Sequence, residues 1–267
     1  MKNNIIKLLR FLVAAAFWLT VWFLCAKAVG FQIILPSPFD TLKALAKIAA
    51  TSEYVKACLG SFINIMTGLL TGTAAGVLLA ILTSCSGIAY HLISPVLSVI
   101  RSTPVASFIL LAYVWLGRSV VPSFASMIMI VPVIWAGVCH GIRSIDKDIL
   151  EVADVFKLSP WKKFSRLYAP GALPSFINSF CTCLGLAWKA GIAAEVLCTP
   201  KDTIGTHLYQ SKVYLESAEL FAWTATIIVL SMIFEKTAAW LLGRLKKRIH
   251  PYFNASDRKG VRADDSI

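Results

Sequence analysis

The sequence predicts an all-α integral membrane protein with about six transmembrane helices. Its 267 residues are 57% hydrophobic and only 15% charged, and its mean hydropathy is +0.72. Soluble domains have roughly 45–50% apolar and about 25% charged residues, so much of this chain's surface is expected to face lipid. The composition therefore excludes a disordered chain, a fibrous repeat and a secreted disulfide scaffold.

Long apolar stretches are the second observation behind this prediction. A helix needs about 20 apolar residues to cross a hydrocarbon core of roughly 30 Å, because its polar backbone groups can be satisfied only within the helix. We find about six stretches of this length, separated by polar segments. They occupy approximately residues 8–28, 60–84, 96–116, 120–138, 173–197 and 220–242.

The first stretch has one competing interpretation, a secretory signal peptide, because Lys2, Lys7 and Arg10 lie at its start. The apolar core of a signal peptide has about 7–15 residues, whereas residues 11–26 continue without a charge. We therefore predict a retained first span. Residues 40–50 have helical apolar spacing and are expected to lie in the membrane interface. The first span and this interfacial segment together form the first predicted region of the chain, residues 1–59.

The positive charges predict the side of the membrane on which the termini lie. In a six-span topology, seventeen Lys and Arg residues fall on one side and seven on the other. Cytoplasmic segments carry the excess, so both termini of this multi-pass plasma (inner) membrane protein are expected in the cytoplasm. This distribution explains the net charge of +12 without nucleic acid as a partner. Residues 60–245 would form the transmembrane domain and residues 246–267 a basic and polar cytoplasmic tail, frayed or disordered from residue 250 onward.

Three glycines recur at every fourth position of the second stretch: Gly68, Gly72 and Gly76. They share one helix face and allow another backbone to approach closely. Small residues at this spacing are common in membrane bundles. We therefore predict a helix-packing face, which requires no further role in function.

The seven cysteines and four histidines show no pattern of a metal site. The cysteines have no CxxC spacing, and most lie in or beside apolar stretches, where they are expected to be small buried hydrophobic residues. The histidines are scattered without paired ligand spacing. We predict no metal site, no catalytic residue and no cofactor.

A polar segment of about 30 residues separates the fourth and fifth stretches, and helix connections rarely need that length. It begins with an amphipathic helix, and Ser159 and Pro160 then mark the N-cap and first residue of a second helix. A DNA-binding helix-turn-helix is disfavoured, because both ends are tethered to membrane spans, whereas an amphipathic hairpin can dock into a soluble partner. The apolar face of the first helix comprises Ile145, Ile149, Val152, Ala153 and Phe156.

The same segment matches a known loop pattern through Glu151, Val152, Ala153, Lys157, Pro170 and Pro174. These residues resemble the EAA loop of ABC importer permeases, which usually has Glu-Ala-Ala, a Gly four residues later, and Leu-Pro near the next span. The chain departs from it at Val152, Lys157 and Ala169. A Lys in a left-handed turn costs roughly 1–2 kcal/mol more than Gly, which favours a tighter or irregular turn at Lys157.

Other segments extend the resemblance over almost the whole chain. They are Leu-Pro-Ser-Pro at 35–38, Gly-Leu-Ala-Trp-Lys at 185–189, Ala-Ala-Glu at 193–195 and the basic residues of 244–248. Together they resemble the branch of permeases that serves sulfonate, nitrate, taurine or thiamine-precursor importers.

The resemblance implies the transmembrane permease subunit of an ATP-driven ABC importer for a small organic or inorganic solute, and not an enzyme. Such a permease forms a pore as a homodimer in membrane lipid and receives its solute from an extracytoplasmic solute-binding protein. Its EAA hairpin couples it to a separate ATP-binding subunit. The sequence agrees, because it contains no GxxxxGK[ST] phosphate-binding loop.

Lys189 and Glu195 lie in the fifth stretch and are candidates for the translocation path. An ionisable residue inside a span is expensive and usually faces a partner or an aqueous path. The two residues lie about 120° apart around a helix, so they cannot form a simple same-face pair. A cation in the path would favour an anionic substrate. The alternative is that Lys189 snorkels to the interface or pairs with another helix.

An ion-coupled secondary transporter is the alternative function. Such carriers place interrupted spans and paired charges at matching positions of two repeats, and the sequence has no such repeat. A membrane-embedded hydrolase would need a nucleophile with a base or metal ligands inside the bundle. The predicted hairpin favours an importer permease, because neither a secondary transporter nor a membrane hydrolase requires a hairpin that docks a partner. The charges well inside the stretches are Arg10, Arg101, Lys189, Glu195, Glu235 and Lys236.

Overall fold

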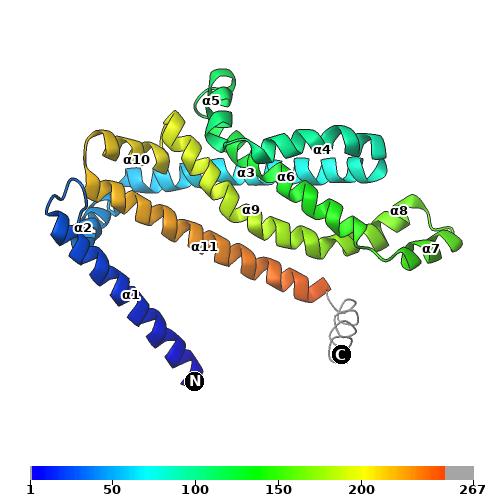
Figure 1. Ribbon diagram of the computed structural model, residues 1–267, viewed down its shortest axis with the longest axis horizontal. Helices are drawn as coiled ribbons and strands as arrows, with labels where there is room; N and C mark the ends of the chain where they lie inside the picture. The colour runs from blue at the N-terminus through cyan, green and yellow to red at the C-terminus, as the bar shows by residue number, and fades with distance from the viewer. Residues whose placement is uncertain (1, 250–267) are drawn as a thin grey trace. The chain divides into compact units, whose positions relative to one another are not determined.

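The computed structural model describes residues 2–249, and within this range all regular secondary structure is helical (Figure 1). The all-α prediction is therefore confirmed, whereas the prediction for residues 250–267 lies outside the described residues. The helices are α1 (Lys2–Val29), α2 (Pro38–Ala49), α3 (Ser52–Cys85), α4 (Gly87–Ser102), α5 (Val105–Leu116), α6 (Val121–Arg143), α7 (Lys147–Val155), α8 (Pro160–Lys163), the π-helix η1 (Phe164–Tyr168), α9 (Ala169–Cys198), α10 (Ile204–Val213) and α11 (Ser217–Ile249).

Five helical segments of the described range are long and apolar enough to cross a membrane, and they correspond to five of the predicted stretches. The third predicted stretch, residues 96–116, is not one continuous helix. The helix breaks between Ser102 and Val105, and α4 and α5 are either one broken span or a re-entrant loop. Pro104 explains the break, because it has no N–H and forces the preceding residue out of the helical region. Thr103 accordingly has the extended angles φ −81° and ψ 135°.

Besides α7, the short helices α2 and α10 lie outside the spans. The predicted helix at residues 40–50 is present as α2, with Ser37 as N-cap accepting a hydrogen bond from the Asp40 amide and Pro38 in the first turn. No sequence pattern predicts α10, because its polar and apolar residues show no clear helical period. Its N-cap is Thr203.

The chain divides into two compact units. The first contains α1, α2, α3 up to Met66, α5, the start of α6 up to Ala125, the end of α9 from Ala190, α10, and α11 up to Leu230. The second contains the remainder of α3, α6, α9 and α11, together with α4, α7, α8 and η1. Each unit has its own core.

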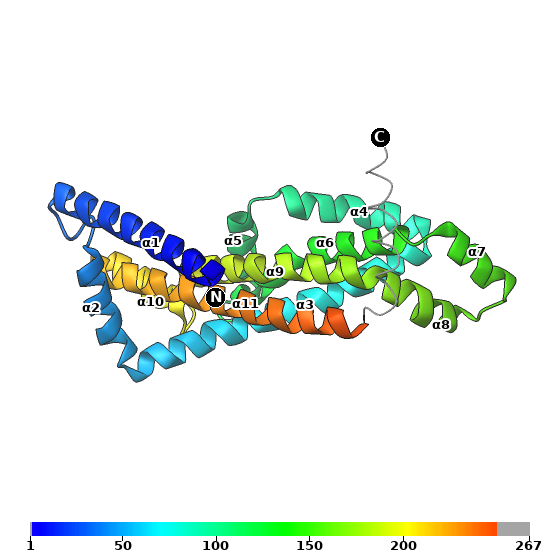
Figure 2. The same cartoon turned by 90° about the horizontal axis from the view of Figure 1, so that it is seen from below.

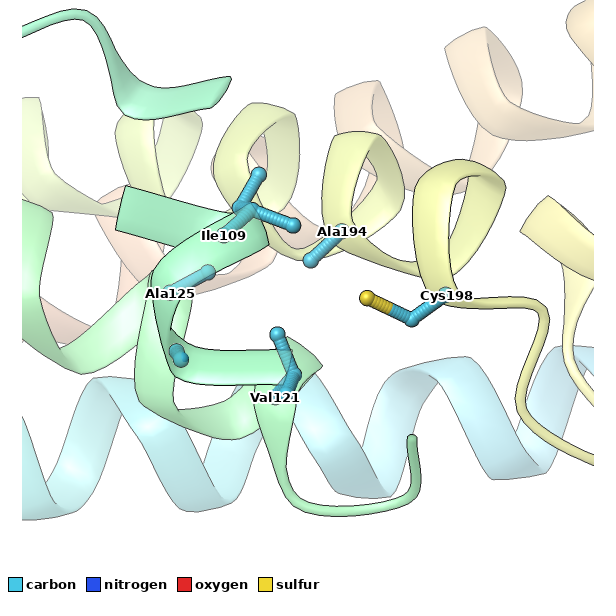
Figure 3. Close-up of a cluster of buried hydrophobic side chains, with 6 residues drawn as sticks. Ile109, Val121, Ala125, Ala194 and Cys198 are labelled. Atoms are coloured by element: carbon cyan, nitrogen blue, oxygen red, sulfur yellow. The ribbon is translucent and has the colours of Figure 1, made fainter. Parts of the chain in front are cut away.

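The core of the first unit includes a cluster of buried side chains between α5, α6 and α9 (Figure 3). Several members are small, which allows these helices to approach closely. The cluster comprises Ile109, Ala112, Val121, Ala125, Ala194 and Cys198.

The core of the second unit is built on close contacts of α3 with α6. A Cβ added at Gly72 would lie 2.9 Å from the Met127 carbonyl oxygen, and one at Gly76 would lie 2.8 Å from the Ile134 Cβ. Gly68 is buried as well. Only glycine allows this spacing between the two backbones at positions 72 and 76.

Candidate functional site

A helical hairpin connects α6 to α9 in the second unit (Figures 1 and 2). Its first helix, α7, begins at the N-cap Asp146, whose carboxylate accepts a hydrogen bond from the Asp148 amide at 3.0 Å. The second helix, α8, begins after Ser159 with Pro160 at its first position. The helical start that the sequence predicts at Ser159 and Pro160 is thus present.

The turn after α7 is a left-handed helix cap at Lys157. This residue has φ +47°, so the expectation of a tighter or irregular turn is wrong. The Lys157 amide donates to the Asp154 carbonyl at 2.9 Å, and the Leu158 amide donates to the Ala153 carbonyl at 3.1 Å. These two bonds are the Schellman pattern, in which glycine is the usual central residue. An ion pair between Asp154 and Lys163 also joins the two arms of the hairpin. The cap hydrogen bonds and this ion pair offset the conformational cost of a lysine in the left-handed region.

The residues of the apolar face predicted for α7 differ in their exposure to solvent. Ala153 is buried, whereas Val152 is 54% and Phe156 75% exposed. Glu151 is exposed beside them, and Trp161 of α8 is 73% exposed. The hairpin therefore presents large apolar side chains and a carboxylate that the described part of this chain does not cover.

Pro170 and Pro174 lie in the first turns of α9 and coincide with an irregular helix. Neither proline has an N–H to donate to the carbonyl four residues earlier. Immediately before them, the Ala169 amide donates to the Phe164 carbonyl five residues back, which is the wider hydrogen bonding of the π-helix η1. The entrance to the long helix α9 is thus distorted on the side of the hairpin.

Glu195 lies at the centre of a buried hydrogen-bond network in the first unit. Its side chain is fully buried, and its Oε2 accepts hydrogen bonds from the Ser61 hydroxyl at 2.6 Å and the Gly205 amide at 3.2 Å. Its Oε1 accepts a longer one from the Asn64 amide group at 3.5 Å. The Ser61 oxygen in turn accepts a hydrogen bond from the Ile204 amide at 2.9 Å. One carboxylate thus joins α3, α9 and the start of α10.

Glycines make this network possible. A Cβ added at Gly205 would overlap the Glu195 Cβ, and one added at Gly60 would overlap the Asp202 carbonyl oxygen. The backbones at both positions therefore approach within distances that no other residue permits. The sequence marks Glu195 as a charge inside a span but identifies none of its partners. Ser61 lies 134 residues away, so no local pattern links the two residues.

Lys189 has a different environment from Glu195. Its side chain is exposed on α9, and no carboxylate of residues 2–249 lies within ion-pair distance of its ammonium group. One turn earlier, a Cβ at Gly185 would lie 2.8 Å from Oε1 of Glu235 on α11. The neighbouring Trp188 is buried against Phe234, with ring centroids 6.0 Å apart. Lys189 thus points away from the core beside a tightly packed helix contact.

Arg101 is a second cation within the apolar stretches, and it lines a cavity of about 130 Å³. The cavity is also lined by Met129 and Pro132 of α6 and by Leu186 of α9. Leu186 and Lys189 are three residues apart on α9, which places them on neighbouring positions of one helix face. The sequence places Arg101 inside an apolar stretch, but no sequence pattern marks it as a site residue.

Comparisons with known proteins agree on one family. Residues 72–251 match the family described as binding-protein-dependent transport system inner membrane component. The nitrate import permease protein NrtB of Synechocystis sp. is 26% identical over 72% of each chain. The taurine transport system permease protein TauC of Escherichia coli is 23% identical over 88% of this chain and 86% of its own.

A solved structure has the same fold. It is a bacterial ABC transporter involved in the import of the acidic polysaccharide alginate, with a TM-score of 0.59 and 17% sequence identity. The match covers 91% of this chain and 96% of the alginate transporter chain.

Proposed function

The chain belongs to the family of binding-protein-dependent transport system inner membrane components, and we propose that it is the permease subunit of an importer driven by ATP hydrolysis on a separate subunit. A permease component of an ABC importer is a multi-pass membrane protein whose task is transport.

The exposed hairpin is the observation that carries this proposal. Val152 and Phe156 leave large apolar surface uncovered outside the long apolar helical segments, and Trp161 adds to it at the start of the segment Pro160–Cys198. An amphipathic helix with such side chains docks into a groove of a partner protein. We assign that partner as the ATP-binding subunit. Glu151 and Lys157 lie at the rim of the contact, and Pro170 and Pro174 lie where the hairpin joins α9.

Two further partners follow from the same assignment. The pore is a homodimer of this chain surrounded by membrane lipid, and an extracytoplasmic solute-binding protein delivers the solute. The excess of Lys and Arg supports an orientation with both termini and the hairpin in the cytoplasm. The hairpin and the ATP-binding subunit then occupy the same compartment, and the binding protein meets the opposite side.

The solute that we propose is a small molecule with an anionic group, of the sulfonate, nitrate or taurine type, with thiamine precursors as the uncharged class of the same branch. Relatives are described as nitrate and taurine permeases. Lys189 and Arg101 place two cations in the apolar part of the second unit, and both lack a carboxylate partner among the described residues. Such charges are retained in membrane proteins mainly where they face a ligand or an aqueous path. Glu195 lies on α9, the same helix as Lys189, and is a buried anchor of the proposed path.

Reconstitution in lipid vesicles tests the proposal. Vesicles that contain the chain and its ATP-binding subunit, with the solute-binding protein outside, should accumulate radiolabelled taurine or nitrate only when ATP is enclosed. A sodium or proton gradient without ATP should drive no uptake. Uptake by the chain alone under an ion gradient would establish a secondary transporter instead.

A further inference from the structure

The second unit contains a polar cavity at the ends of α3 and α6. It has a volume of about 420 Å³ and lies where the apolar parts of both helices stop. Thr83 and Ser84 from α3 line it, together with Tyr90 and His91 from α4 and Arg143 from α6. The Thr83 hydroxyl already donates to the Leu79 carbonyl of its own helix at 2.8 Å. Among residues 2–249, no carboxylate contributes to this lining. The cavity therefore has donors and a positive charge, which suit an anion.

Arg143 is held over this cavity by an aromatic stack. Its guanidinium carbon lies 4.4 Å from the centroid of the Tyr90 ring, and Tyr90 stacks in turn on Trp135 at 5.7 Å. Trp135 is buried and donates a hydrogen bond from Nε1 to the Thr83 hydroxyl at 2.9 Å. Within residues 2–249, Arg143 has no acidic partner. A fixed, unpaired guanidinium binds phosphate oxygens well, because it offers several N–H donors in one plane.

An apolar groove adjoins the cavity. It has a volume of about 200 Å³, and side chains of α3, α6, η1 and α9 line it. Ile142 lines both the groove and the cavity. Along α3, Val77 and Ile81 of the groove are followed on the same helix face by Ser84 of the cavity. The two spaces thus form one site, with an apolar part inside the span and a cationic part at the helix ends.

We propose that this site binds an anionic phospholipid such as phosphatidylglycerol. The phosphate lies at Arg143 beside Ser84, and one acyl chain lies in the groove beside Ile142 and Leu173. The helix ends place the cationic part at the depth of lipid headgroups, where basic residues attract anionic lipids. A free phosphate would use only the cavity and would leave the apolar groove without a role. The inference depends on α3 and α6 crossing a membrane and is independent of the transported solute.

Native mass spectrometry of the purified full chain tests this proposal. Phosphatidylglycerol and phosphatidylcholine of equal chain length are added in turn, and the fraction of chain that retains lipid is measured. Wild type should retain phosphatidylglycerol about fivefold better, the difference expected for one basic residue at an anionic headgroup. Arg143→Gln should remove this preference and Arg143→Lys should largely keep it. Leu173→Trp, which fills the groove, should lower phosphatidylglycerol retention to a similar extent.

Arg244→Gln is the matched control, because Arg244 also stacks on an aromatic ring, with its guanidinium carbon 3.7 Å from the Trp240 centroid, but does not line the cavity. It should leave lipid retention unchanged. Equal retention of both lipids by wild type, or retention unaffected by Arg143→Gln or Leu173→Trp, overturns the proposal. Retention of glycerol phosphate as strong as that of phosphatidylglycerol, and unaffected by Leu173→Trp, also overturns it, since the site would then recognise only an anion. Circular dichroism of each variant establishes that loss of lipid is not loss of fold.

Discussion

The Ser61 hydroxyl donates a hydrogen bond to the Glu195 carboxylate at 2.6 Å and accepts one from the Ile204 amide at 2.9 Å. Both side chains are buried. One serine therefore satisfies a buried carboxylate and a backbone amide at the start of α10. Because unsatisfied polar groups in a buried site are costly, these bonds fix the position of α10 against α3 and α9.

Ser61→Ala should lower the free energy of unfolding by about 1–3 kcal/mol, because it leaves both a carboxylate oxygen and an amide without that partner. Thermal unfolding of the purified chain in detergent measures the change. Thr237→Ala is the control, since the Thr237 hydroxyl is exposed and bonds only to the Ile233 carbonyl of its own helix. Equal melting temperatures for the two variants would contradict the role given to Ser61.

Lys157→Gly should stabilise the hairpin by about 1 kcal/mol, because glycine adopts the left-handed conformation at φ +47° without the cost that a side chain adds. Slower hydrogen exchange of the Leu158 amide, which donates to Ala153, is the measurement. Lys147→Gly should give no such gain, since Lys147 begins α7 in ordinary helical conformation. A similar slowing in both variants would show that the turn at Lys157 is not strained.

Glu151→Lys should uncouple ATP hydrolysis from transport, since it reverses the charge at the rim of the exposed hairpin surface. In reconstituted vesicles, solute moved per ATP should fall by about tenfold, while the amount of chain in the membrane is unchanged. Asp148→Lys makes the same change of charge at an exposed residue of the same helix and should have a much smaller effect. If both variants reduce coupling equally, Glu151 is only one of several solvated carboxylates.

Lys189→Met should reduce uptake of an anionic solute by about tenfold, the loss expected for one charge-assisted contact, with membrane abundance preserved. Lys189→Arg should retain most uptake because it keeps the charge. Uptake and abundance are measured side by side. A proportional fall of both in the Met variant, with recovery of both in the Arg variant, would make Lys189 a structural residue and remove the argument for an anionic solute.

The sequence predicted most of the helices but few of their contacts. Five spans and the start of α8 follow from local patterns, namely apolar length and the Ser159-Pro160 pair. The break at Pro104 has a local signal, a proline within an apolar stretch, but the prediction of that stretch rests on its apolar length alone. No local sequence signal identifies the partners of Glu195, because Ser61 is distant in sequence and meets the carboxylate only once three helices have packed.

The most direct test of the coupling hairpin is photo-crosslinking in native membranes. A benzophenone amino acid replaces Phe156, which is 75% exposed on the hairpin, or Tyr214, which is 71% exposed at the end of α10. After irradiation, the proposed function predicts that position 156 crosslinks to a protein containing a GxxxxGK[ST] phosphate-binding loop and that position 214 does not. No such protein at position 156, or equal capture at both positions, would contradict the assignment of the hairpin as the site that binds the ATP-binding subunit.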